Sequence, residues 1–360
     1  QEMSRRGELI GAAALALALA CRGPAPAAPP RETPAADRPA AQAAPNLSPT
    51  SPSELSHGEA TVGTGGTEPR IEPDAPAPAP EKVKRIRLEM RHRTITIAPN
   101  VRYAAWTFGD RVPGPAMRVT VGDTIDFTLV NAAPIPHSLD FHAAEVAPSR
   151  VYTNVNPGDS ISYRWVARVP GAFMYHCGTA PVAQHIANGM YGAIIVDPHR
   201  PLPRAREFVF VQSEFYGQKA DTGGTLLGLD WQKLLGLAPD YVVFNGHANE
   251  YAAHPLQVHP GELLRMYVVN AGPNRISSFH VVGAIFERVY VDGVLGRPLQ
   301  GVQTVDVPVG GGAIFELRLA EPGTYPFVTH AFADATKGGV GMLRARAPGD
   351  TAGAGPVAGH

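Results

Sequence analysis

The chain contains only two cysteines among its 360 residues, Cys21 and Cys177. An exported protein that depends on disulfide bonds carries an even set of cysteines in its folded region. Cys177 is the single cysteine of the region that we predict to fold, so it has no ordered partner for a disulfide bond. The presence of this single thiol therefore needs another explanation.

The sequence also lacks an excess of charge of either sign, with a formal net charge of -1 at pH 7. Such a balance gives no indication of a nucleic-acid partner or of a membrane-surface face. The apolar run at 9–20 is too short to span a bilayer. It follows two arginines and ends in small residues, which is the layout of a secretory signal peptide. We therefore expect residues 1–21 to be a signal peptide and the protein to be exported to the periplasm or cell envelope.

Cys21 lies where a bacterial lipoprotein carries its acylated cysteine, which favours lipidation and a membrane tether. Cleavage just before Cys21 without acylation is the alternative. Residues 22–81 are rich in proline and alanine and cannot bury enough apolar surface to become ordered. We expect them to form a disordered linker that holds the folded part away from a membrane. Residues 349–360 are expected to be a short disordered tail.

From residue 82 onward the chain consists of short alternating segments rich in Val, Ile, Thr and Tyr, separated by Gly, Pro, Asn and Asp. This pattern is typical of an antiparallel β-sandwich. It occurs twice, since "MRVTVGDTIDFTLVNAA" (117–133) matches "LQVHPGELLRMYVVNAG" (256–272). We predict an all-β protein with two related sandwich domains, at 82–200 and 201–348, and one short helix near 229–239.

A copper site is predicted from the stretch "YHCGTAPVAQHIANGM" (175–190). Copper held for electron transfer takes two imidazoles, one thiolate and a weak axial thioether. Cys177, His185 and Met190 supply three of these ligands, and His137 in "PHSLDFH" supplies the fourth. A structural zinc site would need four strong ligands and usually more cysteines. A buried inert thiol would explain Cys177 but not the spacing of the other residues.

The stretches "PHSLDFHAA" and "YHCGTAPVAQHIANGMYG" resemble the copper-containing nitrite reductases. Further similar stretches are "YVVFNGH" (241–247), "SSFHVVGAIFERVYVDG" (277–293) and "PGTYPFVTH" (322–330), so the resemblance covers about 83–346. It implies two tandem cupredoxin domains (Greek-key β-sandwiches), a homotrimer, and type 1 and type 2 copper in each subunit. The implied activity is the reduction of nitrite to nitric oxide. The short loop before His185 is similar to a subgroup that includes outer-membrane lipoproteins.

A second metal site is indicated by the alternation of side chains along strands. Successive residues on a strand point to opposite faces, so His176 points away from the metal that Cys177 binds. His137 and His142 are five apart, so at least one of them should face elsewhere. His142 and His176 would belong to a site of three imidazoles and a water. The resemblance implies His330 of a neighbouring subunit as the third type 2 ligand; a core or interface role is the alternative for His330.

The adjacency of His176 and Cys177 indicates an electron path between the two metals, and proton donors are needed as well. The electron would pass from the type 1 to the type 2 copper through the adjacent residues Cys177 and His176. Nitrite reduction also needs two protons, and proton donors must lie beside the bound substrate. Asp140 is placed to reach a ligand on the second copper. The resemblance implies His280 as the second catalytic group and Val282 as the apolar cap of the substrate pocket.

Two other functions are weaker explanations of the same residues. A multicopper oxidase builds a trinuclear copper centre from His-x-His pairs, and the region predicted to fold contains none. A pure electron-transfer cupredoxin would leave the second set of histidines unexplained. The chain carries no cytochrome c domain, so we expect a separate cytochrome c or small cupredoxin as electron donor, docking near Met190.

Overall fold

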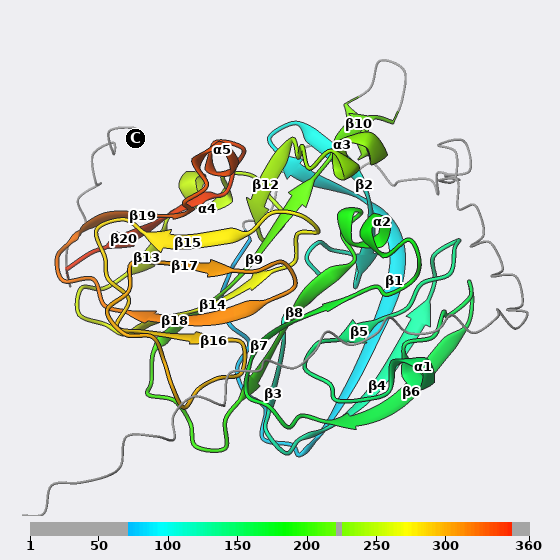
Figure 1. The fold of residues 1–360 in the computed structure, drawn as a ribbon, viewed down its shortest axis with the longest axis horizontal. Coiled ribbons are helices and arrows are strands. Elements are labelled where there is room, and N and C mark those ends of the chain that lie inside the picture. The colour runs from blue at the N-terminus through cyan, green and yellow to red at the C-terminus, as the bar shows by residue number, and fades with distance from the viewer. Residues whose placement is uncertain (1–70, 221–224, 348–360) are drawn as a thin grey trace, which may run out of the picture. The chain divides into compact units, whose positions relative to one another are not determined.

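Four β-sheets organise the chain in the computed structural model, which describes residues 71–220 and 225–347 (Figure 1). All described residues belong to one structural unit, Pro52–His360. The predicted signal peptide, Cys21, the predicted tail and the predicted linker up to residue 70 lie outside the described residues. Within the described ranges, no helix has the length and apolar character needed to cross a membrane.

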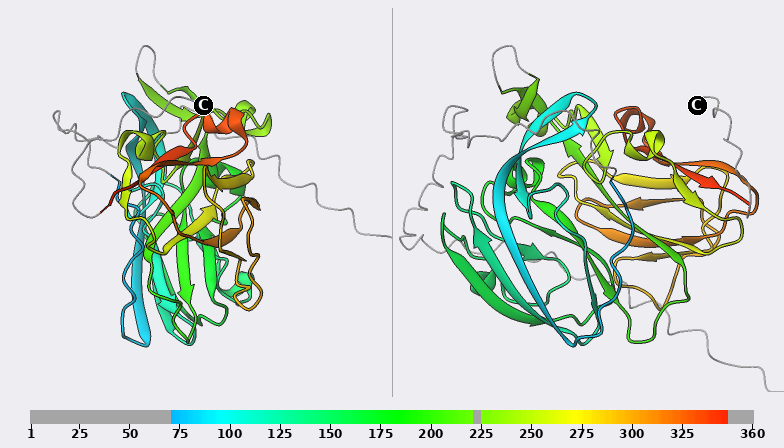
Figure 2. Two further views of the ribbon diagram at one scale, coloured as in Figure 1. Left: turned by 90° about the vertical axis from the view of Figure 1, so that its left-hand side faces the viewer. Right: turned by 180° about the vertical axis from the view of Figure 1, so that it is seen from behind.

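The first pair of sheets carries most of the residues predicted for the first domain. The larger sheet has the order β10 (Gly217–Lys219), β11 (Leu226–Leu229), β2 (Val101–Phe108), β1 (Val83–Ala98), β4 (Thr124–Asn131) and β6 (Ser160–Val166). The smaller sheet has the order β3 (Met117–Thr120), β8 (Tyr191–Asp197), β7 (Gly171–His176) and β5 (Asp140–Phe141). Seen from behind, the long strand β1 curves across this pair (Figure 2).

The second pair of sheets follows in the chain. One sheet has the order β12 (Tyr241–Phe244), β9 (Arg206–Phe215), β14 (Leu264–Asn270), β18 (Gly312–Leu317) and β16 (Arg288–Val291). The other has the order β13 (Leu256–Val258), β20 (Val340–Ala345), β19 (Gly323–Thr329), β15 (Ser277–Val281) and β17 (Thr304–Val307). The described helices are all short: α1 (Pro148–Val151), α2 (Val182–Ala187), α3 (Trp231–Leu235), α4 (Glu250–Ala253) and α5 (Phe332–Ala335).

Burial along individual strands explains how the sheets stack. In β4, Ile125, Phe127 and Leu129 are buried while the residues between them are half-buried, as expected for a strand with one face on a core. Every residue of β14 is buried, because its alternate side chains enter two different apolar clusters. Met266 faces the core of the second pair of sheets, whereas Tyr267 joins a cluster shared with β7 and β8. The two pairs of sheets are therefore packed together through apolar side chains.

The all-β cupredoxin prediction is confirmed, and the predicted helix near 229–239 corresponds to α3. Asp230 caps this helix, since its side chain accepts a hydrogen bond from the Lys233 N–H at 3.0 Å. The domain limits of 82–200 and 201–348 stay a prediction. Strands β10 and β11 lie beyond residue 200, yet β11 pairs with β2 of the first sheet.

The end of the predicted linker differs from the expectation of a disordered tether up to residue 81. The N–H of Val209 donates to the Pro73 carbonyl at 2.7 Å, and the N–H of Ala75 donates to the Glu207 carbonyl at 3.2 Å. Asp74 also forms an ion pair with Arg206 at 2.8 Å. Residues 71–75 therefore lie along β9, held by backbone pairing and by the packing of Ile71 and Ala75 against apolar clusters.

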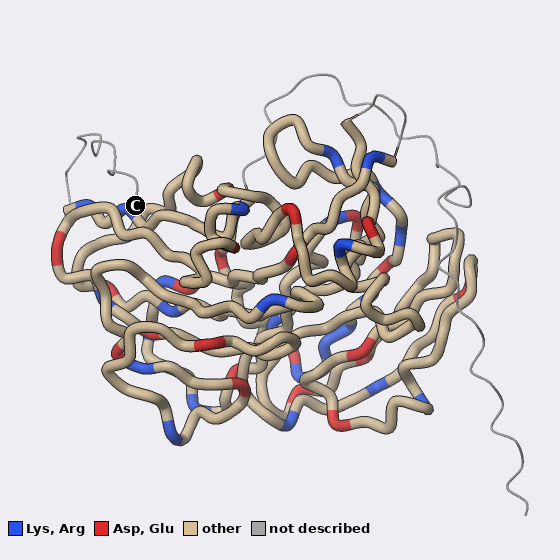
Figure 3. The backbone as a smooth tube through the Cα atoms, turned by 45° about the horizontal axis from the view of Figure 1, so that its top comes forward, with Lys and Arg blue, Asp and Glu red and all other residues tan. Residues whose placement is uncertain are grey.

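Charged residues of both signs are interspersed over the described chain (Figure 3), and a few of them form a network between the two pairs of sheets. Arg118 of β3 forms ion pairs with Asp197 and Glu207, each at 2.7 Å. Glu207 also contacts Arg265, which in turn contacts the fully buried Glu316, both at 2.6 Å. Every charge in this network has an opposite partner, which buried charges require.

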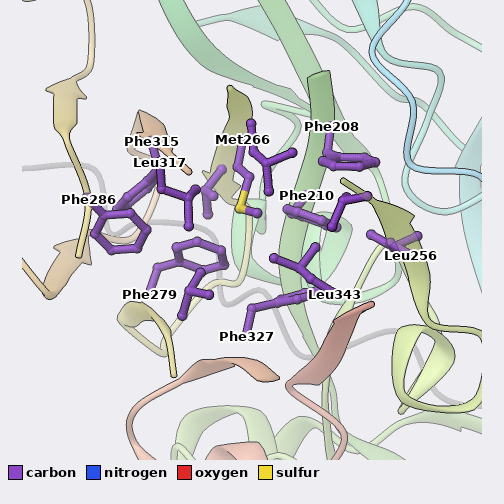
Figure 4. Close-up of a cluster of buried hydrophobic side chains, with 14 of the residues drawn as sticks. Phe208, Phe210, Leu256, Met266, Phe279, Phe286, Phe315, Leu317, Phe327 and Leu343 are labelled. Atoms are coloured by element: carbon purple, nitrogen blue, oxygen red, sulfur yellow. The ribbon is translucent and has the colours of Figure 1, made fainter. Parts of the chain in front are cut away.

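Phe279 lies in the aromatic core of the second pair of sheets (Figure 4), and its removal should lower stability strongly. Its ring is fully buried, and the ring centroid of Phe315 lies 4.8 Å away. Phe279→Ala should decrease the free energy of unfolding by about 3–5 kcal/mol, because it removes apolar burial and leaves a cavity. Guanidinium unfolding would measure the change. Leu235→Ala, at a side chain that is 60% exposed, should change stability by at most about 0.5 kcal/mol; equal effects would contradict the prediction.

Candidate metal centres

Two groups of potential metal ligands lie at the end of strand β7. The first cluster consists of His137, Cys177 and His185, and all three side chains are buried. The second cluster consists of Asp140, His142 and His176, and it is more open. The ligand atoms within each cluster lie within 4.8 Å of one another. The structure thus separates the residues as the alternation of strand side chains predicts.

The first cluster has its ligand atoms converging on one point. The Nδ1 atoms of His137 and His185 are 3.0 Å apart. The Cys177 Sγ atom lies 3.2 Å from Nδ1 of His185 and 3.9 Å from Nδ1 of His137. Two imidazole nitrogens and one sulfur therefore surround a small volume from which water is excluded.

Backbone hydrogen bonds fix the segments that carry these ligands. The His137 N–H donates to the Val155 carbonyl at 3.2 Å, and the Val155 N–H donates back to the His137 carbonyl at 2.8 Å. The Cys177 N–H donates to the Met190 carbonyl at 3.0 Å, and the Met190 N–H donates to the His185 carbonyl at 3.2 Å. Met190 is fully buried in the same apolar cluster as Cys177. The loop thus holds the thioether residue next to the thiol.

Ser138 is a residue of this site that the sequence did not reveal. Its backbone N–H donates to the Cys177 Sγ atom at 3.3 Å. Its hydroxyl oxygen accepts hydrogen bonds from the Gly178 N–H and the Thr179 hydroxyl, both at 3.1 Å. Burial raises the pKa of the Cys177 thiol, and these backbone and hydroxyl groups oppose that effect. In the sequence, the only signal that could have indicated Ser138 is its position directly after His137.

The imidazoles of the first cluster are held in the neutral form. Burial lowers the pKa of His137 to about 2, with a smaller contribution from the neighbouring imidazoles of His185 and His92. Burial likewise lowers the pKa of His185 to about 4. A neutral imidazole has a free nitrogen lone pair, so both rings are prepared to act as ligands.

The second cluster brings two imidazoles together with their free nitrogens facing each other. The Nε2 atoms of His142 and His176 are 3.0 Å apart. Nδ1 of His142 lies 3.0 Å from the Gly310 carbonyl, and Nδ1 of His176 lies 2.9 Å from the Cys177 carbonyl. A carbonyl only accepts, so in the neutral rings both Nδ1 atoms carry the proton and both Nε2 atoms are lone pairs. Two lone pairs at this distance repel each other unless a cation lies between them.

Asp140 completes the second cluster. It is the register partner of His176 in the β5–β7 pair, which places the carboxylate beside the two imidazoles. Burial lowers the pKa of His176, and the Asp140 charge opposes this shift more weakly. The carboxylate is half-buried and so remains reachable by a small solute near the two ring nitrogens.

The structure does not bring His330 into the second cluster. His330 is exposed, its N–H donates to the Ser278 carbonyl at 2.7 Å, and its ring centroid lies 5.2 Å from that of His280. Nδ1 of His280 lies 2.7 Å from the Gln303 carbonyl. Val282 lies in the turn after β15, half-buried. These three predicted site residues therefore share a face of the second pair of sheets, and their roles stay predictions.

The donor sets of the two clusters fit copper. The first offers two neutral imidazoles, a thiol and a nearby thioether in a dry setting, which suits a copper ion used for electron transfer. The second offers imidazole nitrogens whose Nδ1–H groups are anchored on carbonyls, as is usual for metal-binding histidines. Its exposure leaves room for further ligands.

Comparison with known proteins identifies copper proteins that are similar to this chain. A family model described as multicopper oxidase matches residues 89–201. The chain is 40% identical over 353 residues to the copper-containing nitrite reductase of Neisseria gonorrhoeae, covering 95% of this chain and 88% of that protein. It is 42% identical over 285 residues to that of Neisseria meningitidis serogroup B, covering 77% and 72%. The solved copper nitrite reductase of Nitrosomonas europaea superposes with a TM-score of 0.68 at 36% identity, covering 75% and 98%. The chain belongs to the copper-containing nitrite reductases.

The depressed pKa of His185 predicts how the stability of the metal-free protein depends on pH. A histidine with a folded pKa of about 4 and an unfolded pKa of about 6.5 binds its proton more readily in the unfolded chain. Its stabilising contribution is therefore present above pH ~6.5 and is lost as the pH falls towards ~4, by about 1.4 kcal/mol per pH unit. His185→Gln should make the slope of unfolding free energy against pH shallower by this amount. Equal slopes in chemical denaturation would contradict the prediction.

Proposed function

We propose that this protein catalyses the copper-dependent reduction of nitrite to nitric oxide. The observation that carries the proposal is the pairing of a buried Cys/His cluster with an open His/His cluster at adjacent residues, Cys177 and His176, in a chain of this family. Each nitrite takes up one electron and two protons and gives nitric oxide and water. When bound, copper supplies the one-electron chemistry at the first site and a Lewis-acidic position for nitrite at the second.

The first cluster would hold the type 1 copper. His137, Cys177 and His185 are the strong ligands, and Met190 is the weak axial ligand. Their burial excludes nitrite and water, so this site exchanges electrons and not substrate. We propose that a separate cytochrome c or small cupredoxin delivers the electron near Met190.

The second cluster would hold the type 2 copper. His142 and His176 provide two ligands through Nε2, and His330 of a neighbouring subunit is proposed as the third. The exposed position of His330, away from His142 and His176 within one chain, agrees with a ligand that serves another subunit. A homotrimer would give every subunit one completed site.

Two residues of this chain would handle protons. Asp140 lies beside the ligand nitrogens of His142 and His176 and can hold a proton near bound nitrite. His280 would act from the opposite side once a neighbouring subunit brings His330 to the site, since their rings are in contact. Val282 would exclude water from the same pocket.

Two further proposals concern the location of the protein. Export to the periplasm or cell envelope fits the N-terminal sequence, and a lipid on Cys21 would tether the enzyme to a membrane.

A multicopper oxidase or a simple electron-transfer cupredoxin would share the first cluster. The open second cluster with Asp140 beside it favours the reductase.

Anaerobic turnover of nitrite with a reduced dye tests the function directly. Copper-loaded protein should be coloured and should produce nitric oxide, one molecule for each electron consumed. Cys177→Ala should lose the visible charge-transfer band, because the thiolate ligand is removed. His176→Ala should keep the band and lose at least about 100-fold in turnover, because only the second site is damaged. Full copper content with no nitric oxide would support the electron-transfer alternative.

Replacing the carboxylate of Asp140 should slow turnover without removing copper. Asp140→Asn cannot deliver a proton, so kcat should fall by about 10²–10⁴-fold while the visible band is unchanged. Glu145→Gln is the matched control, since this exposed carboxylate lies in the segment that follows β5 and pairs only loosely with Arg168 at 3.8 Å. It should keep nearly full activity. Similar losses in the two variants would indicate a general charge effect and not proton delivery.

A further inference from the structure

We propose that His92 is a positioning residue of the first copper site, which accepts a hydrogen bond from the outer ring nitrogen of His137 and thereby lowers the reduction potential of the copper. The inference rests on the proposed function in one respect, namely that His137 binds copper through Nδ1. His92 belongs to strand β1, which is distant in the sequence from the loop that carries Cys177 and His185.

The contact between His92 and His137 lies on the side of the His137 ring that faces away from Cys177 and His185. Nδ1 of His137 faces His185 and Cys177, and Nε2 of His137 lies 3.2 Å from Nε2 of His92. The two rings meet nearly edge to face, at an interplanar angle of 67°. This arrangement lets the N–H of one ring point at the lone pair of the other.

The direction of the hydrogen bond follows from the chemistry of the ligand. A neutral imidazole carries one N–H, and a metal bound at Nδ1 leaves the proton on Nε2. His137 is then the donor through Nε2–H, so Nε2 of His92 must be the acceptor. The proton of the neutral His92 ring is therefore on Nδ1.

The ring of His92 is held in this position by Trp106. The two residues are partners in the β1–β2 register, and their rings stack with centroids 5.0 Å apart and an interplanar angle of 7°. The backbone of Trp106 is fixed, because its backbone N–H donates to the Asn188 carbonyl at 2.8 Å. Its ring also contacts the rings of His185 at 4.8 Å and His137 at 5.5 Å.

Trp106 thus covers both imidazoles of the first cluster on the side where His92 approaches, and it is only 5% exposed. A water molecule at this position would exchange and move, whereas the stacked imidazole is a fixed acceptor. Hydrogen bonds of this kind to the remote nitrogen make a ligand more basic and fix its orientation. A more basic ligand stabilises copper(II) more than copper(I), which lowers the reduction potential.

Two substitutions separate the hydrogen bond from the packing. His92→Phe keeps an aromatic ring for stacking on Trp106 but removes the acceptor. We expect its copper(II) affinity to fall by about 10–100-fold relative to copper(I), which corresponds to a rise in potential of about 59 mV for each factor of ten. His92→Gln offers a carbonyl oxygen and should restore at least half of the shift. His199→Phe, at an exposed histidine outside both clusters, should leave the potential unchanged.

Redox titration of the visible band measures these potentials without reference to nitrite turnover. A potential in His92→Phe equal to that of His199→Phe would overturn the inference, and so would a shift that His92→Gln does not reduce. Nitrogen-15 NMR of the unmodified copper(I) protein gives an independent reading that does not depend on a variant folding. It should show Nε2 of His92 unprotonated; a proton on that nitrogen would also overturn the inference. Protein that binds no copper would refute the proposed function instead.

Discussion

Adjacent side chains on a strand must point to opposite faces, and both metal sites depend on this rule where β7 ends. His176 is the last residue of the strand, and Cys177 continues its pairing through the hydrogen bond to the Met190 carbonyl. One peptide unit therefore separates a ligand in the buried cluster from a ligand in the open cluster. The Cys177 carbonyl even accepts the Nδ1–H of His176, so the residue that binds in one cluster also orients a ring in the other.

The position of β7 is determined by both pairs of sheets. Its neighbours β5 and β8 hold it within the smaller sheet, while β14 and β18 pack against it from the other pair. The approach is very close at Gly312, where a β-carbon would lie 2.0 Å from the Ala172 carbonyl oxygen, so only glycine fits. Two residues earlier, Gly310 has a φ of 77° and turns its carbonyl towards Nδ1 of His142. The segment 310–312, which packs closely against β7, thus also determines the tautomer of His142 in the second cluster.

The parts of the site that were predictable from the sequence are those that depend on short-range rules. Ligand chemistry identified Cys177 and His185, and the period of two along a strand separated His176 from Cys177. The surrounding residues were not predictable in this way, because they arrive from distant segments. The Gly310 carbonyl comes from another sheet, and His92 reaches His137 only through the register of β1 with β2, which periodicity does not specify. The same limit explains why two strand pairings were not predicted, that of β11 with β2 and that of residues 71–75 with β9. Both depend on backbone hydrogen bonds between segments without a distinctive sequence.

The contrast in burial between the two clusters supports their proposed roles more strongly than the ligand types do. Imidazole ligands occur in both, but His137 and Cys177 are fully buried, whereas His142 is exposed. A copper ion held in the buried cluster, where Trp106 packs on both imidazoles, would gain or lose an electron with little rearrangement of solvent or substrate. An exposed pair of lone-pair nitrogens beside a carboxylate can instead accept a third ligand, a small anion and protons from outside. The buried and the open cluster therefore lie on opposite faces of one strand, and their difference in exposure follows from which face the apolar core covers.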